Sequence, residues 1–281
     1  MKNIAAVILA AGEGTRMRSS IPKVLHTICG RSMIDYPLLT LKSIGIQNIV
    51  VVVGHRSGLV QENLTGVKCI KQDKLLGTGD AVLKTKNVLL KDNKIDMVLI
   101  TCGDVPLLKA ETLRRLISRH LSTRSGCTLL TSHLKNPTGY GRILRSGNDK
   151  IVKIVEEVDA SIYEKVTEEI NVGVYCFDKD ALFDALQEIK PNNRKKEYYL
   201  TDTIEILAKS GIVVDSISTD ETEEFLGVNT RSDLMQAEEV VRRRVLADIM
   251  QKGVSIIDPN NTYIQEGVEI KRDTVIYPIH L

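Results

Sequence analysis

The chain has 281 residues, 43% of them hydrophobic, which is enough for one substantial α/β domain with an ordinary core and a smaller C-terminal appendage. Its formal net charge is only +2, so charge alone indicates neither a nucleic-acid surface nor a membrane surface. The five cysteines lack Cys-x-x-Cys spacing, which argues against zinc, a redox pair or a disulfide framework. With no signal peptide and no membrane span expected, we predict a cytoplasmic protein.

Three short β-branched runs lie at residues 4–9, 49–53 and 97–101, with helical patterns between them. This alternation predicts parallel strands joined by crossover helices, a Rossmann-like α/β arrangement. Pro37 would break a helix that began much before Asp35, so we expect the first helix to start near Asp35 and to end at Gly45. A second helix is expected from Ala110 to about His120.

Shorter mixed segments follow at 142–144, 151–156 and 172–177, and we expect antiparallel or edge strands that cover the substrate side. Further on, Thr230 to Asp233 form a capping-box signature, and an apolar stripe continues to Gly253. This pattern predicts a long arm helix. Arg242, Arg243 and Arg244 lie on it as a basic cluster that we interpret as a solvated helix face.

The last segment has isoleucines six residues apart, at 264, 270 and 276, as in hexapeptide β-helix repeats. One turn at most fits before Leu281, whereas a solenoid needs about three repeats to bury a continuous core. Chance spacing in an Ile-rich chain is the alternative.

The first apolar run ends in a loop of small residues, Ala10 to Gly14, with Arg16 and Lys23 close behind. Such a loop predicts backbone N–H groups that face an anion, and the two cations indicate polyphosphate. The loop lacks the third glycine of G-x-G-x-x-G and the Gly-Lys-Ser/Thr of a P-loop. An ordinary turn, with Gly12 and Gly14 at positive φ, is the alternative.

The pattern L-A-A-G-x-G-T-R-M at 9–17, followed by Pro22-Lys23, resembles the signature of sugar-1-phosphate nucleotidyltransferases. Seven further motifs arrive in that family's order, at 77–79, 102–107, 137–142, 155–157, 169–173, 197–202 and 227–229. Together they resemble the uridyltransferase half of the bifunctional bacterial enzymes that make UDP-N-acetylglucosamine. Ordered motifs are far more specific than a lone glycine loop.

The resemblance implies a mixed, mostly parallel nucleotide-diphospho-sugar transferase sheet with flanking helices. It divides the chain into a nucleotidyltransferase domain (1–229), an arm helix (230–253) and the truncated start of a left-handed β-helix (254–281). The implied reaction joins UTP and N-acetylglucosamine-1-phosphate into UDP-N-acetylglucosamine and pyrophosphate, without acetyltransferase activity. The alternatives are another sugar- or alditol-phosphate substrate, or a catalytically weak paralogue that binds a nucleotide sugar.

Transfer between two anions relies on alignment and charge neutralisation, so we expect cations and Mg²⁺ at the site. The resemblance makes Lys23 and Arg16 the catalytic cations. It makes Asp104 and Asn229 the Mg²⁺ ligands, and Asp104 follows a predicted strand at the carboxyl edge where ligands bind. Without the resemblance, a helix N-cap role for Asp104 and a turn role for Asn229 have about the same weight as the metal-ligand roles.

The resemblance also assigns residues to the two substrates. The nucleotide set is Leu9, Ala10, Ala11, Gly12, Gln72, Gly77, Thr78, Cys102, Gly103 and Asp104. The sugar set is Gly141, Glu156, Asn171, Tyr199 and Asn229. Within these sets, Gln72, Gly77 and Thr78 are expected to read the uracil, and Asn171 to meet the 2-N-acetyl group.

Two residues depart from the family pattern: Cys102 replaces a common tyrosine, and Asp80 replaces a common histidine. We expect Cys102 to change the floor near the nucleotide and Asp80 to bring a carboxylate near the triphosphate. The expected partners are UTP and a sugar-1-phosphate, with no nucleic acid and no membrane. A monomer or weak oligomer is expected, because the family trimer forms through a complete β-helix.

Overall fold

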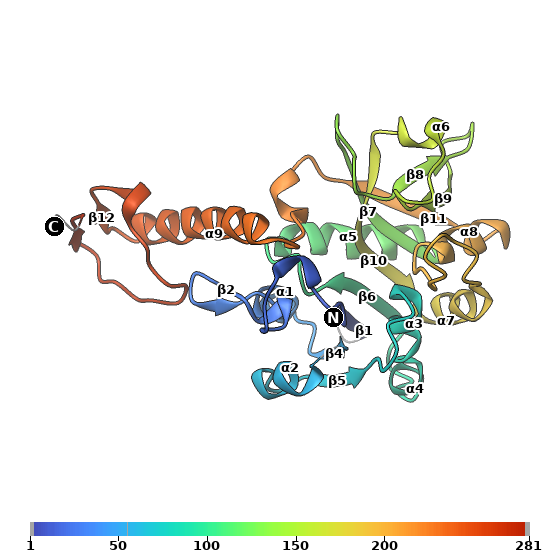
Figure 1. Ribbon diagram of the computed structural model, residues 1–281, viewed down its shortest axis with the longest axis horizontal. Helices are drawn as coiled ribbons and strands as arrows, with labels where there is room; N and C mark the ends of the chain where they lie inside the picture. The colour runs from blue at the N-terminus through green and yellow to red at the C-terminus, as the bar shows by residue number, and fades with distance from the viewer. Residues whose placement is uncertain (1–2, 55, 279–281) are drawn as a thin grey trace.

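The computed structural model describes residues 3–54 and 56–278, and within them nine strands form one mixed sheet. Its order is β11-β7-β10-β6-β1-β4-β5, with β8 paired to β10 and β9 paired to β8 (Figure 1). The strands are β1 Ile4–Ala10, β4 Asn48–Val53, β5 Lys68–Lys71, β6 Met97–Cys102, β7 Cys127–His133, β8 Arg142–Arg145, β9 Ile151–Val155, β10 Glu169–Asp178 and β11 Val214–Ser218.

The strands β4, β1 and β6 are mutually parallel, as the β-branched runs predict, and β5 adds a further parallel strand beside β4. β1 lies between β4 and β6, and nearly all of its residues are buried because both faces of the sheet are covered. Parallel strands end at the same edge, so the loops that follow β1, β4, β5 and β6 lie together there. This edge is the expected place for a ligand.

Residues 172–177 are expected to form an antiparallel or edge strand that covers the substrate side. They belong to β10, which is antiparallel to both β6 and β7, so the antiparallel direction is confirmed. The covering position is wrong, because β10 lies inside the sheet between these two strands. Val174 and Cys176 pack into one face of the sheet while Tyr175 and Phe177 pack into the other, which requires cover on both sides. The strands at 142–144 and 151–156 are confirmed as the antiparallel pair β8 and β9.

Helices cover both faces of the sheet, which gives three layers. One face carries α1 Asp35–Ser43, α2 Ser57–Asn63 and α5 Ala110–Thr123. The other face carries α3 Thr78–Leu83, α4 Lys86–Leu89, α7 Lys179–Glu188 and α8 Asp202–Lys209. The short α6 Ile162–Lys165 lies beside β8. The predicted start of α1 at Asp35 is confirmed, and Gly45 follows its end at a φ of 85°.

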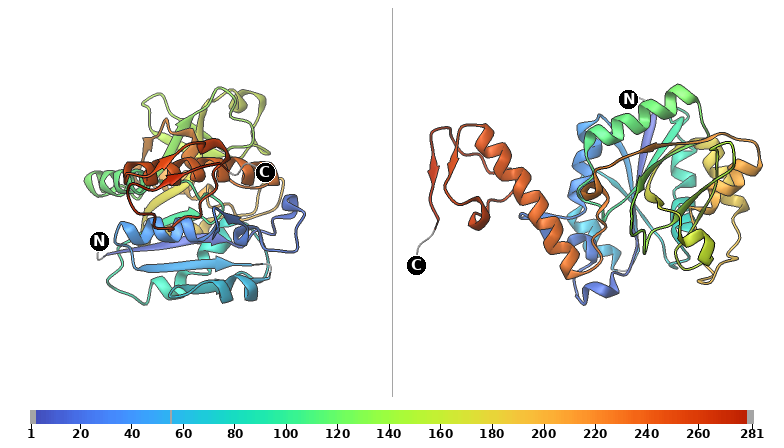
Figure 2. Two further views of the ribbon diagram at one scale, coloured as in Figure 1. Left: turned by 90° about the vertical axis from the view of Figure 1, so that its left-hand side faces the viewer. Right: turned by 90° about the horizontal axis from the view of Figure 1, so that it is seen from above.

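The predicted arm helix is α9 Arg231–Gln251, which leads away from the sheet (Figures 1 and 2). Its N-cap Thr230 and Asp233 form the predicted capping box. Beyond it, β12 Ser255–Ile256 pairs in parallel with β13 Val275–Ile276. Ile264, Ile270 and Ile276 are partly buried and pack against the small core beside β12, as the hexapeptide spacing predicts for residues on one side of a coil. The division into three domains stays a prediction.

The remaining elements are short: the pair β2 Thr27–Ile28 and β3 Arg31–Ser32, and the 3-10 turns η1 Thr15–Met17, η2 Lys23–Leu25, η3 Thr222–Phe225 and η4 Pro259–Asn261. The hairpin of β2 and β3 packs beside α9. No helix in the described residues is long and apolar enough to cross a bilayer.

Of the three arginines of α9, Arg243 is exposed as expected, whereas the other two donate to backbone oxygens elsewhere in the chain. Arg244 donates to the backbone oxygen of Leu107 at 3.0 Å, which ties the helix to the sheet domain. Arg242 donates to the backbone oxygen of Asn260 at 2.8 Å, which ties the helix to the coil turn. Through these two contacts the cluster links α9 to the sheet domain and to the coil turn.

Candidate active site

The loop after β1 is held against the ends of β4 and β6. The backbone N–H of Gly103 donates to Leu9 O at 2.9 Å, so the ends of β1 and β6 meet. Gly54, which follows β4, has no room for a side chain: an added Cβ would lie 2.3 Å from Ala11 O. The predicted nucleotide residues 9–12 and 102–104 therefore form one surface at the carboxyl edge.

The conformation of this loop agrees only in part with the alternative of an ordinary turn, which places both glycines at positive φ. Gly14 has a φ of 65°, and a Cβ there would lie 2.6 Å from the Cβ of Lys23. Gly12 is not at positive φ and has nothing near the place of a Cβ. Gly14 is thus needed to bring the loop against Lys23, while the open space at Gly12 leaves its backbone accessible to a ligand.

Lys23, Asp104, Asn229 and Arg16 come together from four separate segments. Lys23 Nζ forms an ion pair with Asp104 Oδ2 and donates to Asn229 Oδ1 at 3.0 Å. Arg16 Nη2 donates to the same Asn229 oxygen at 2.9 Å. The site therefore holds two cations beside two oxygen-bearing side chains, which suits the alignment of anionic substrates.

Backbone contacts fix this arrangement. The N–H of Val228 donates to Asp104 O at 2.9 Å, so the loop before α9 lies along the end of β6. The N–H of Asn229 donates to Asp233 Oδ2 at 2.9 Å, the carboxylate that also completes the helix cap. Asp104 is thus in a turn after β6 and is not a helix N-cap, while Asn229 is anchored by the start of α9.

The donor set at Asp104 and Asn229 fits Mg²⁺. A carboxylate and an amide carbonyl are hard oxygen ligands, and Mg²⁺ commonly takes one or two protein oxygens and completes its shell with water and phosphate. Asp104 Oδ1 has no hydrogen-bond partner among the described residues. Those residues hold no group of three or more His, Cys, Asp or Glu side chains placed to ligate a metal.

The predicted uracil residues meet at the end of β5. The N–H of Gln72 donates to Val53 O at 2.8 Å, and its side-chain Nε2 donates to Gly77 O at 3.0 Å. Thr78 Oγ1 accepts from the N–H of Leu200 at 3.0 Å, so this region is joined to the 197–201 loop. A Cβ on Gly77 would lie 2.5 Å from Tyr198 O, which explains the glycine.

Contrary to expectation, the Asp80 carboxylate faces Gln72 and Lys84 and not the triphosphate loop. Its Oδ2 accepts from Gln72 Nε2 at 2.8 Å, and its Oδ1 lies 3.2 Å from Lys84 Nζ. At Cys102, burial and the nearby Asp104 raise the pKa of the thiol to about 12, so the side chain is a small neutral floor.

Three of the predicted sugar residues also meet. The N–H of Asn171 donates to Gly141 O at 2.9 Å, and an added Cβ on Gly141 would lie 3.6 Å from Glu156 Oε2. Glu156 Oε1 accepts from the hydroxyl of Thr201 at 2.9 Å, and burial raises the pKa of Glu156. Asn171 Nδ2 donates to the hydroxyl of Tyr175 at 2.6 Å.

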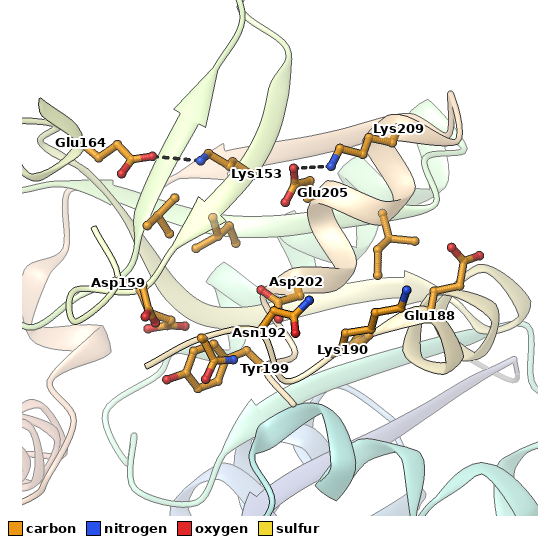
Figure 3. A pocket seen from close by; sticks show the side chains of 16 residues that line it. Lys153, Asp159, Glu164, Glu188, Lys190, Asn192, Tyr199, Asp202, Glu205 and Lys209 are labelled. Carbon is orange, nitrogen blue, oxygen red and sulfur yellow. Dashed lines mark hydrogen bonds and ion pairs between the residues drawn. The ribbon is translucent and has the colours of Figure 1, made fainter. Parts of the chain in front are cut away.

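Tyr199 lies apart from the reaction centre, in a cavity of about 600 Å³ between β9 and the start of α8 (Figure 3). Its buried hydroxyl has no partner among the described residues. Glu156, Asp159 and Asp202 also line this cavity. Burial and the nearby Glu156 raise the pKa of Asp202 to about 6. None of Lys23, Asp104 or Asn229 lines it.

Gly54, Thr201 and Asp233 contribute to the site without having been predicted. Asp233 was visible as a capping residue, and its role in holding Asn229 follows from the cap geometry. Thr201 lay inside the 197–202 motif. Gly54 had only a weak signal, a glycine directly after a buried parallel strand.

A family model described as nucleotidyl transferase matches residues 5–237, the sheet domain and the start of α9. The chain belongs to the nucleotidyl transferase family. This confirms the family predicted from the ordered motifs. The match includes all the residues of the reaction centre and of the two substrate sets.

Curated relatives match almost the whole chain. The bifunctional protein GlmU of Pelotomaculum thermopropionicum is 45% identical over 277 residues, covering 98% of this chain and 60% of the relative. GlmU of Clostridioides difficile is 44% identical over 277 residues, which also cover 98% of this chain and 60% of the relative. The chain thus spans about 60% of the length of these relatives.

One solved structure shows the same fold. It is a Bacillus anthracis protein provisionally named as a glucose-1-phosphate thymidylyltransferase, solved with a sucrose. It superposes with a TM-score of 0.67 at 22% identity and covers 85% of this chain and 95% of its own. The Rossmann-like nucleotidyltransferase fold predicted from the motifs is thereby confirmed.

Proposed function

We propose that this nucleotidyl transferase is a Mg²⁺-dependent uridyltransferase that converts UTP and N-acetylglucosamine-1-phosphate into UDP-N-acetylglucosamine and pyrophosphate. The observation that carries the proposal is the convergence of Lys23, Arg16, Asp104 and Asn229 at the carboxyl edge of the parallel strands. The similarity to GlmU over 98% of the chain supports the choice of substrates.

In this proposal a phosphate oxygen of the sugar-1-phosphate attacks the α-phosphorus of UTP, and pyrophosphate leaves. Lys23 neutralises the charge that develops on the α-phosphate, and Arg16 holds the departing phosphates. Both side chains already point to one oxygen of Asn229, so little reorganisation is needed to aim them at a bound anion.

Asp104 and Asn229 would hold the Mg²⁺, which when bound supplies charge neutralisation between the two anionic substrates. Asp104 Oδ1 is the oxygen best placed for this, because Lys23 pairs with Oδ2. A protein carboxylate and an amide oxygen leave positions for phosphate oxygens, as nucleotide-bound Mg²⁺ requires.

The substrates are proposed to lie on either side of this centre. Gln72, Gly77 and Thr78 bind the uracil at the end of β5, through hydrogen bonds that a purine does not satisfy. On the other side, Gly141, Glu156 and Asn171 bind the hexosamine. Glu156 accepts from sugar hydroxyls, and Asn171 meets the N-acetyl group. Tyr199 is a weaker candidate, because it does not take part in the contacts that bring Gly141, Glu156 and Asn171 together.

The deciding experiment measures pyrophosphate release from UTP and Mg²⁺ with a panel of sugar-1-phosphates. We expect the highest kcat/KM with N-acetylglucosamine-1-phosphate. A higher value with another sugar- or alditol-phosphate would correct the substrate. No release with any acceptor, together with tight binding of UDP-N-acetylglucosamine, would favour the alternative of a catalytically weak paralogue that binds a nucleotide sugar. Lack of acetyltransferase activity stays a prediction, tested by thiol release from acetyl-CoA with glucosamine-1-phosphate.

A further inference from the structure

We propose that Asp80 is a positioning residue which fixes the orientation of the Gln72 amide and thereby sets the preference for uracil over cytosine. The inference rests on the proposed function, because it concerns the nucleotide of that reaction. It starts from the contact between Asp80 Oδ2 and Gln72 Nε2, at 2.8 Å.

The Gln72 amide has only one orientation that satisfies its neighbours. Gln72 is 3% exposed, and its amide nitrogen lies 3.0 Å from Gly77 O as well as 2.8 Å from the Asp80 carboxylate. A carbonyl and an ionised carboxylate can only accept hydrogen bonds. The reversed amide would place three oxygens together without a proton between them, which is strongly unfavourable in a buried position.

Asp80 is itself held in place. The residue is 8% exposed, and its second oxygen lies 3.2 Å from the ammonium group of Lys84, one turn later in α3. Both carboxylate oxygens are therefore engaged, one by Gln72 and one by Lys84. The carboxylate thus acts as a fixed acceptor.

The locked amide presents a defined pattern to the nucleotide. Both hydrogens of Nε2 are used inside the protein, so Oε1 is left as an acceptor, and it has no partner among the described residues. The N–H of Gly77 likewise has no partner among them and is a donor nearby. An acceptor beside a donor matches the N3–H and carbonyl of uracil, whereas cytosine presents the reverse pattern at the same edge.

The test measures binding of UTP and of CTP, each with Mg²⁺, by calorimetry in the absence of any sugar phosphate. The wild-type chain is expected to prefer UTP. Asp80→Leu keeps the branched shape, in a larger volume, without an acceptor, and Asp80→Ala is a second variant in case the first does not fold. In either variant only Gly77 O still orients the Gln72 amide, so the reversed amide becomes more accessible. The ratio of the two dissociation constants is expected to fall by up to about ten-fold, the effect of one lost hydrogen bond.

The matched control is Asp80→Asn, whose side-chain oxygen can still accept from Gln72 and should keep most of the preference. A purely structural role for Asp80 would weaken UTP and CTP alike and leave the ratio unchanged, which would overturn the inference. An equally large loss of preference in Asp80→Asn, or a wild type without preference, would also overturn it. Since binding is measured apart from turnover, a wild type that prefers UTP but makes no product contradicts only the proposed function.

Discussion

Lys23 Nζ lies 3.0 Å from Oδ1 of Asn229, a residue 206 positions later in the chain. The contact joins the loop after β1 to the segment that begins the arm helix. The same ammonium group of Lys23 also pairs with Asp104, so Lys23 is held by two residues at once. Binding of a nucleotide with its metal would exchange these internal contacts for contacts to phosphate.

Replacement of Lys23 by alanine is expected to lower kcat by about 100-fold or more, because one preorganised cation is lost from the transition state. The half-buried Asp104 loses its partner as well, so a modest loss of stability should accompany it. Pyrophosphate release and urea unfolding measure the two effects. Lys252→Ala is the control, since this exposed lysine pairs with Asp248 on α9, at the opposite end of this helix from Asn229. Equal activity of both variants would remove Lys23 from the catalytic role.

Replacement of Asp104 by asparagine keeps the shape of the side chain and removes its charge. We expect the Mg²⁺ concentration for half-maximal activity to rise by about ten-fold or more, with a lower plateau, because the anionic ligand is lost. EDTA should abolish wild-type activity, and added Mg²⁺ should restore it. Asp149→Asn, on an exposed carboxylate, serves as control. An unchanged Mg²⁺ titration in Asp104→Asn would contradict the assignment.

Replacement of Gly54 by alanine should damage the nucleotide loop. The new Cβ would lie 2.3 Å from Ala11 O, so the backbone must move, at an expected cost of about 1–3 kcal/mol in unfolding free energy. UTP affinity should fall as well, because Ala11 belongs to the predicted nucleotide surface. Gly58→Ala is the matched control: it has open space and lies in α2, so it should stabilise by about 0.5–1 kcal/mol. Urea unfolding and UTP titration distinguish the two variants.

The raised pKa of Asp202 predicts a pH dependence of stability. Its folded-state pKa is about 6, against a usual value of 3.8, because of burial and the nearby Glu156. The folded state therefore binds the proton more tightly, and the resulting stability is present below about pH 4 and lost as the pH rises to about 6. Asp202→Asn should then raise the unfolding free energy at pH 7 by about 1 kcal/mol, a value limited by partial exposure to water.

Urea unfolding at pH 4 and pH 7 measures this effect, with a clear gain expected only at pH 7. Asp180→Asn is the control, since this exposed acid also lies in the first turn of a helix, α7. A gain of equal size at both pH values would show that the surroundings of Asp202 do not raise the pKa of its carboxyl group.

Local patterns in the sequence predicted the elements that depend on neighbouring residues. The β-branched runs of β1, β4 and β6, the start of α1 at Asp35 and the cap of α9 at Thr230 are all visible within a few residues of chain. The ordered motifs predicted the family. These features are local because strand and helix periodicity and capping each involve residues close in sequence.

Tertiary structure alone decided the position of β10 between β6 and β7, since an isolated apolar strand does not reveal its neighbours in a sheet. It also decided that Gly54 must lie against Ala11, and that Asp80 faces Gln72 and not the triphosphate loop. The sequence by itself therefore determined which segments are strands, helices and motif loops. Contacts such as Lys23 with Asn229 join residues far apart in the chain, so only the packing of both faces of the sheet could bring them together.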